Sequence, residues 1–398
     1  MSREKSLQKA IVLSLMLTNI WCGAAYAANG ADGADGTNPP PKTDAIGSSG
    51  LTADYTDSAN NGTDGSKGTS DGSQEIGGGK GGNGGSISAS HTVSGTLSGA
   101  IAITAAAGSG GKGGDSVYAQ GDKNYTFGGS GGSGGNVELG LTVTGAVLDG
   151  NQNITLTATG GSGGNGGQSN GYGDNLGSDR NNKGGQGGKG GDASAKGLIL
   201  TGDAAQTTVT VANITITATG GKGGNNGSSY DAAAIVPGSG GAAAAYGITS
   251  VAAGKATITA ANITVEAAGG SGGDAGAKNS FFKGDTVPEI DNGGEAKATM
   301  AYGLQAQNGE IALTAQAVSV TATGGKGGAG SGSSSVNNNT GFDPSGASLA
   351  ALKGGVGAQA ALAVTAARVL SHIMVIILMV APEVQAVLAA LLRPGDFR

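Results

Sequence analysis

The clearest signal in this chain is a short stretch of alternating apolar and polar residues that runs directly into glycine. It occurs as ANITITATGGKGGNNG at 212–227, NITLTATGGSGGNGG from Asn153, NITVEAAGGSGGDAG from Asn262 and VSVTATGGKGGAG from Val318. A fifth, less regular copy, IAITAAAGSGGKGG, begins at Ile101. Alternation with a period of two is typical of a β-strand with one buried face. The pattern therefore predicts five repeats, each containing such a strand.

Two further features precede each of the last four copies. A glycine followed by Leu or Ile lies 13 to 16 residues upstream, at Gly140-Leu141, Gly197-Leu198, Gly247-Ile248 and Gly303-Leu304. Between this pair and the copy lies another alternating stretch, such as TTVTVA at 207–212 or EIALTA at 310–315. The pattern of each repeat therefore predicts three short strands followed by a glycine-rich loop.

The spacing of apolar residues predicts a corner between the second and third strands. Val211 and Ile214 are three residues apart rather than two, so the chain must bend or bulge to keep both pointing inward. The strands that follow this corner begin 49 to 60 residues apart. A corner repeated at such a period is typical of a β-solenoid, in which successive coils stack about 4.8 Å apart. We expect an all-β fold with about five coils over 77–330.

Stacking of the coils predicts two ladders of side chains. Threonines at equivalent positions would line the outside of the solenoid: Thr155, Thr215 and Thr264. Asparagines would occupy the corner: Asn153, Asn213 and Asn262. Because asparagine tolerates left-handed backbone angles and carries both a donor and an acceptor, we expect structural corners bonded to the next coil. We prefer this interpretation to glycosylation of the N-I-T sequences.

Residues 1–27 predict an export signal. A basic start, MSREKSLQK, precedes the apolar core AIVLSLMLTNIW, and Ala25-Tyr26-Ala27 has the small-x-small form of a cleavage site. Cleavage after Ala27 would make Ala28 the first mature residue. The alternative is an uncleaved membrane helix, for which the apolar core is short. The single cysteine, Cys22, lies inside this segment, so the mature chain would carry no disulfide.

Three other segments lack the repeat pattern. Residues 28–76 are rich in Gly, Asp and Pro and predict a disordered acidic leader. Residues 331–356 predict a linker, and 357–398 form an apolar tail almost without glycine. We consider three interpretations of this tail: a membrane helix interrupted by Arg368 and Glu383, a helix that caps the solenoid, or out-of-frame translation of further repeat DNA.

The amino-acid composition argues against several classes of function. Glycine accounts for 83 of 398 residues and aromatic residues for 4%, which argues against a conventional globular core. The net charge is −6 and the lysines are scattered, so a nucleic-acid-binding surface is not expected. With only two histidines, a histidine metal cluster is not expected either. We predict no enzymatic activity and no catalytic residues; a β-helix carbohydrate-active enzyme, using two carboxylates, stays as an alternative.

The glycine runs suggest loops. They lack the Lys-Ser or Lys-Thr ending of a phosphate-binding loop, and we expect flexible surface segments without a cofactor. Residues 110–118, GGKGGDSVY, match a calcium-binding nonapeptide with Asp115 as the ligand. Such motifs act in tandem and these copies are isolated, so a calcium-binding secreted repeat module is kept as the first alternative, ahead of the carbohydrate-active enzyme. A further interpretation, ranked behind loops, is that the runs pack as polyproline II strands.

The signal segment, the NITITATGG-type repeats and the asparagine corners resemble the passenger region of Gram-negative autotransporter-type surface proteins, over 1–330. The resemblance implies a right-handed parallel β-helix, export through a C-terminal outer-membrane barrel and a role as an adhesin. The residues after Gly357 depart from that family, because they contain no series of ten-residue alternating strands.

Together these observations predict an exported, non-enzymatic surface protein: an autotransporter passenger-like adhesin or a structural repeat fragment. We expect it outside the cell or on the outer-membrane surface of a Gram-negative bacterium. Its partners would be host or bacterial surface molecules, with no nucleic acid. Contact with membrane would occur only through export or through the apolar tail.

Overall fold

A computed structural model provides the structure of the chain. It describes residues 29–46, 55–68, 76–97, 99–116, 126–148, 152–169, 183–201, 207–230, 235–251, 255–280, 294–297, 299–307, 310–330, 333–335, 360–362 and 376–377. All regular structure in these residues is β-strand, and they include no helix that could cross a membrane. The expected all-β class is confirmed.

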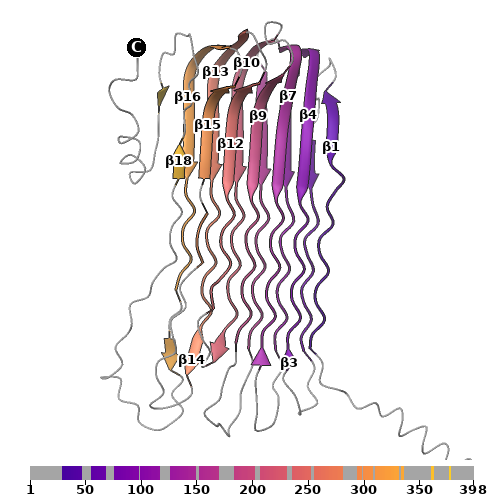
Figure 1. Cartoon of the computed structure of the whole chain (residues 1–398), viewed down its shortest axis with the longest axis vertical. Helices are drawn as coiled ribbons and strands as arrows, with labels where there is room; N and C mark the ends of the chain where they lie inside the picture. The colour runs from indigo at the N-terminus through magenta and orange to yellow at the C-terminus, as the bar shows by residue number, and fades with distance from the viewer. Residues whose placement is uncertain are drawn as a thin grey trace, which may run out of the picture.

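The strands occupy one half of the molecule and the glycine runs the other (Figure 1). Strands of the first layer, all in parallel pairings, follow in spatial order β1 (Lys42–Ile46), β4 (Ile87–Leu97), β7 (Val137–Leu148), β9 (Ala193–Thr201), β12 (Ala243–Ser250), β15 (Thr299–Ala306) and β18 (Ala360–Leu362). Each of these strands forms half of one turn of the chain, and a strand of the second layer forms the other half.

Strands of the second layer are parallel to one another too. They follow in spatial order β2 (Tyr55–Ser58), β5 (Ile101–Ala106), β8 (Asn153–Thr159), β10 (Thr208–Thr219), β13 (Lys255–Ala268), β16 (Glu310–Thr323) and β19 (Ile376–Ile377). The two layers join in one 14-stranded sheet, because the start of β10 pairs with the end of β7, Thr208 with Val147.

Five short strands lie at the far ends of the glycine runs. They form a three-stranded sheet and a two-stranded sheet, from β11 (Ser229–Tyr230), β14 (Lys278–Ser280) and β17 (Ser333–Ser335), and from β3 (Ile76–Gly77) and β6 (Thr126–Phe127). Figure 1 shows β3 and β14 at the end opposite the long strands.

Apolar side chains fill the space between the two layers of long strands. The first apolar residue of each of the five alternating copies lies in register with that of the next copy, and all five are buried: Ile101, Ile154, Ile214, Ile263 and Val318. The expected stacking of these residues is therefore confirmed. A parallel column of this kind removes apolar surface from water while the backbone hydrogen bonds of the sheet stay intact.

The expected division into three short strands is wrong. The second and third predicted strands are one continuous strand in β10, β13 and β16, with one unpaired position where a corner was expected. In β10 the inward side passes from Val211 to Ile214, so that Ala212 and Asn213 both face outward. The three-residue step is accommodated within a strand because the partner strand makes the same step, and the register is kept on both sides of it.

A bulge between β7 and β9 contains the glycine of one Gly-Leu pair. Gly197 is the extra residue between Lys196, which pairs with Gly140, and Leu198, which pairs with Leu141. A Cβ on Gly197 would lie 2.1 Å from the carbonyl oxygen of Gly247. Only glycine therefore fits at this position, because a side chain would overlap the next strand.

The described part of the apolar tail is strand. Ala360 pairs with Thr299 and Ile376 pairs with Val318, so these residues lie beside the last long strands of both layers. The rest of 357–398 lies outside the described residues, as do residues 1–28. The helix and reading-frame interpretations of the tail stay predictions, and so does the signal cleavage at Ala25, Ala27 and Ala28.

Candidate functional site

The glycine runs form a two-layered slab, and this slab is the most unusual feature of the molecule. Six runs lie below the first layer of strands, at 29–38, 77–86, 127–136, 183–192, 235–242 and 294–297. Six lie below the second layer, at 59–68, 107–116, 159–169, 219–228, 268–277 and 323–330. They are the parallel undulating traces in the lower half of Figure 1.

Hydrogen bonds between neighbouring runs repeat every three residues. Most runs consist of triplets with a first glycine, a second glycine and a third position, as in GGS or GGK, whereas the runs at 29–38 and 59–68 keep only the first glycine. The first glycine donates to a third-position carbonyl of the next run in the same layer: Gly131 N to Gln186 O at 2.8 Å and Gly134 N to Lys189 O at 2.8 Å. One bond of each triplet therefore holds a layer together.

The second glycine donates to the facing layer and ties the two layers together. Gly132 N donates to Gly111 O at 2.9 Å, and Gly164 N donates to Gly132 O at 2.8 Å. Bonds of this kind continue without a break through Thr63, Gly82, Gly111, Gly132, Gly164, Gly188, Gly224, Gly238, Gly273, Gly294 and Gly328. The ladder thus crosses the whole slab from its first run to its last.

The third position supplies the remaining donor, and an Asp or Asn side chain in the preceding run accepts it. Asn225 N donates to Asn165 Oδ1 at 2.9 Å, Asp274 N to Asn225 Oδ1 at 2.8 Å, and Ala329 N to Asp274 Oδ1 at 2.9 Å. Because the side chains lie outside the slab and bend back to the backbone, they satisfy N–H groups that no glycine carbonyl reaches.

These runs are polyproline II helices, and the expectation of flexible loops is wrong. A threefold repeat with all hydrogen bonds made to other segments is the pattern of this helix, which has three residues per turn and no internal bonds. None of the glycines that lie in contact between the runs has a backbone φ in the left-handed region. From the sequence alone this arrangement ranks behind loops, because the runs are short and interrupted by segments such as 168–182.

Glycine is required because the backbones touch. A Cβ on Gly132 would lie 1.9 Å from the carbonyl oxygen of Gly82, and a Cβ on Gly163 would lie 2.1 Å from that of Gly188. Both glycines of a triplet therefore face other runs, and only the third position has room for a side chain. The period of three in the sequence follows from this geometry.

The leader contributes the first run of each layer, so the expectation of disorder is wrong for its described residues. Gly33 N donates to Lys80 O at 2.6 Å, and Lys80 N donates in return to Asp32 Oδ1 at 2.7 Å. Between the layers, Gly79 N of the first layer donates to Ser66 O of the leader's second-layer run at 2.9 Å. The aspartates of the leader, predicted to solvate a disordered segment, thus accept backbone hydrogen bonds.

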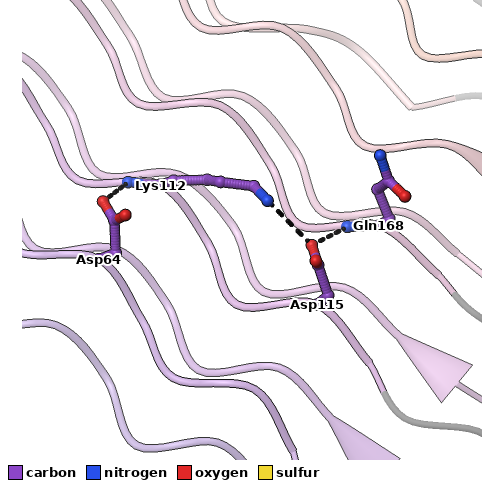
Figure 2. Close-up of polar contacts among 4 residues, drawn as sticks. All are labelled: Asp64, Lys112, Asp115 and Gln168. Atoms are coloured by element: carbon purple, nitrogen blue, oxygen red, sulfur yellow. Dashed lines mark hydrogen bonds and ion pairs between the residues drawn. The ribbon is translucent and has the colours of Figure 1, made fainter.

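Asp115, the candidate calcium ligand, has the same structural role (Figure 2). Its Oδ1 accepts from Gln168 N at 2.8 Å and from the Nζ of Lys112 at 3.1 Å, while Lys112 N donates to Asp64 Oδ1 at 2.7 Å. Burial raises the pKa of Asp115, but the Gln168 hydrogen bond and the charges of Lys112 and Lys67 outweigh it and leave the pKa below its ordinary value. The described residues contain no group of three or more His, Cys, Asp or Glu that could hold a metal.

The three corner asparagines lie in register on the outside of the second layer and form a ladder. Asn213 Nδ2 donates to Asn153 Oδ1 at 2.9 Å, and Asn262 Nδ2 donates to Asn213 Oδ1 at 2.8 Å. Each amide repeats the direction of its neighbour, so the donor of one strand meets the acceptor of the previous one. Ala317 takes the next position and ends the ladder.

A groove of about 730 Å3 lies on the outer face of the first layer, where the glycine runs become strands. Two carboxylates line it, but each already has a partner: Glu138 forms an ion pair with Lys196, and Asp192 Oδ1 accepts from Ala242 N at 2.7 Å. Two tyrosines on neighbouring strands, Tyr246 and Tyr302, stack on each other with ring centroids 5.2 Å apart. The carboxylates of the groove thus have structural partners rather than the arrangement of a glycosidase pair.

Comparison with known proteins gives little. No family model matches the chain, and no curated protein matches it. Among solved structures, a springtail antifreeze protein from Granisotoma rainieri, described as a nine polyproline type II helical bundle, is 21% identical over 55% of this chain and 80% of that chain. Its TM-score is 0.13, which is too low to carry an argument about fold or function.

Proposed function

We propose that the chain is an exported, non-enzymatic surface protein, an autotransporter passenger-like adhesin or a fragment of a structural repeat protein. One observation carries the proposal: the unbroken glycine ladder from Thr63 to Gly328, which crosses both layers. It makes the slab rigid with backbone alone, and all third-position side chains then face outward. A rigid scaffold with outward side chains suits presentation of a surface rather than catalysis.

Export follows from residues 1–27 as the sequence predicts them, and the slab is compatible with an extracellular site. The hydrogen bonds that hold it need neither a disulfide nor a bound ion, so neither the oxidation state nor the ion content of the medium affects them. We propose a right-handed solenoid in which each coil gives one strand and one glycine run to each layer. The six runs of each layer then correspond to six coils, one more than the sequence predicts, because the leader supplies the first.

Cell fractionation tests the proposal. The full chain is produced in a Gram-negative host, and protease is added to intact cells. We expect a mature protein that begins at Ala28 and is cleaved or labelled from outside, and we expect such cells to bind host or bacterial surface material better than cells without it. An uncleaved chain retained in the cytoplasm would contradict export, and surface exposure without any binding would leave only the structural role.

The calcium-binding module is tested separately. Circular dichroism and the melting temperature are measured with calcium and with a chelator. A large gain of β signal on addition of the ion would favour that alternative. We expect no change, because the Oδ1 of Asp115 already accepts hydrogen bonds from Gln168 and Lys112.

A further inference from the structure

The outer face of the second layer carries a regular array of threonines. Fifteen outward positions on β5, β8, β10, β13 and β16 form three columns across the strands. The columns are Ala102, Thr155, Thr215, Thr264 and Ser319; Thr104, Thr157, Thr217, Glu266 and Thr321; and Ala106, Thr159, Thr219, Ala268 and Thr323. We call these residues the threonine face.

Register fixes this face in two directions. Neighbouring strands pair residue by residue, so the columns repeat at the strand spacing of about 4.8 Å. Along each strand every second residue faces outward, which gives a repeat of about 6.6 Å. Threonine is β-branched, which restricts its first side-chain torsion, so each hydroxyl and methyl group has few allowed orientations. The face is therefore an ordered two-dimensional lattice before anything binds.

Ten of the fifteen positions of the lattice are threonine, and nearly all fifteen are uncharged. Glu266 is its single charged member, no member is aromatic, and threonine, alanine and serine fill the other positions. The opposite face of the molecule differs: the corresponding columns of the first layer include Glu138 and Lys196, which pair with each other, and the stacked Tyr246 and Tyr302. The regularity thus belongs to one face and does not follow from the fold alone.

We propose that the threonine face binds the surface of ice. An uncharged partner matches a nearly uncharged face, and a partner that repeats in two directions can meet every position of the lattice. The oxygen atoms on a face of hexagonal ice repeat in two directions at spacings close to those of the threonine face. A folded protein or a single disordered polymer lacks such a repeat and would satisfy only part of the array.

The physical basis is preorganisation. The threonine methyl groups order the water above them, and the hydroxyls anchor that water by hydrogen bonds. Because the strands are held in register and the side chains are restricted, little conformational entropy is lost when this water joins an ice lattice. The inference goes beyond the proposed surface role, and it assigns to one face a ligand that the other face does not share.

The test uses the purified mature chain and growing ice. Fluorescent protein is followed on a single ice crystal, and recrystallisation of fine-grained ice is timed with and without it. We expect the protein to coat the crystal and to slow recrystallisation. Thr157→Lys, which puts a charge in the middle column of the lattice, should lose most of both effects. Thr249→Lys, on the outer face of the first layer, is the matched control and should keep them.

A gain of function makes the test sharper. Glu266→Thr completes the middle column, so it should increase ice coating above that of the natural chain. Circular dichroism establishes that each variant keeps its fold. Absence of the protein from the ice, or equal effects of the Thr157 and Thr249 changes, would overturn the proposal. Retention on crystalline cellulose or chitin but not on ice would overturn it too and would identify a flat polysaccharide as the ligand. Surface exposure on cells is measured independently, so failure here leaves the proposed surface role intact.

Discussion

Gly164 donates its backbone N–H to the carbonyl oxygen of Gly132 in the facing layer at 2.8 Å, and a Cβ at position 164 would lie 1.9 Å from the carbonyl oxygen of Gly111. The same residue is thus required both as a donor and as an empty space. This double requirement recurs along the slab and leads to the first prediction.

Gly164→Ala should destabilise the protein strongly. Overpacking a well-packed interior costs about 1 to 3 kcal/mol, and here the obstacle is the backbone of Gly110 and Gly111 rather than a side chain that can move, so we expect at least about 3 kcal/mol. Urea unfolding followed by circular dichroism measures the loss. Ser162→Ala, at an exposed third position two residues away, is the control and should be nearly neutral. Equal stability of the two variants would show that the runs are not in contact.

The asparagine ladder predicts a graded effect. Asn213 makes two side-chain hydrogen bonds, to Asn153 and from Asn262, whereas Asn262 makes one. Each such bond contributes about 1 kcal/mol, so Asn213→Ala should cost about twice as much as Asn262→Ala. Thermal melts of both variants and of the double variant test the order, and the double variant should add little to Asn213→Ala alone. Full additivity would speak against the ladder.

The lowered pKa of Asp115 predicts that the unfolding free energy of the protein decreases in acid. Its pKa in the folded chain lies below the ordinary value, so its charge stabilises the fold above the unfolded pKa of about 3.9. That contribution is lost as the pH falls through the folded value. Asp115→Asn keeps an oxygen for the Gln168 N–H but does not titrate. The stability difference between the natural chain and this variant should be constant near neutral pH and shrink below about pH 4.

The measurement is the unfolding free energy of both proteins across that range. Asp274→Asn, whose Oδ1 likewise accepts one backbone hydrogen bond, from Ala329 N, serves as a comparison without a lysine contact. A difference that grows in acid would contradict the sign of the pKa shift.

The leader should be protected from exchange. Because Gly33 N and Gly36 N donate to Lys80 O and Asn83 O, their amide hydrogens should exchange slowly in heavy water, with protection like that of the later runs. Removal of residues 29–68 should leave β4 and β5 as open edges and promote self-association, which size-exclusion chromatography would detect. Rapid exchange of the Gly33 amide hydrogen would instead support a disordered leader.

The sequence alone predicted the strand half of the molecule well. Alternation of Ile with Thr and the regular distance between copies indicated parallel stacking, and the Asn-Ile-Thr phrases placed three asparagines at equivalent positions. A period of two depends on which side of a strand is buried, and that information is local. The three-residue step at Val211 was visible too, although its accommodation within the continuous strand β10 was not.

The sequence also determined the period of three in the glycine runs, but it did not determine what that period meant. A single GGx run has donors and no partners, so by itself it is indistinguishable from a flexible loop. Only the tertiary structure places six runs in each of two layers. In that arrangement the second glycine of a triplet donates to a carbonyl of the facing layer, and the side chains of Asp32, Asp64 and Asp115 accept backbone hydrogen bonds. Order in these runs arises from hydrogen bonds between segments some 50 residues apart, and such bonds exist only once all the runs are assembled.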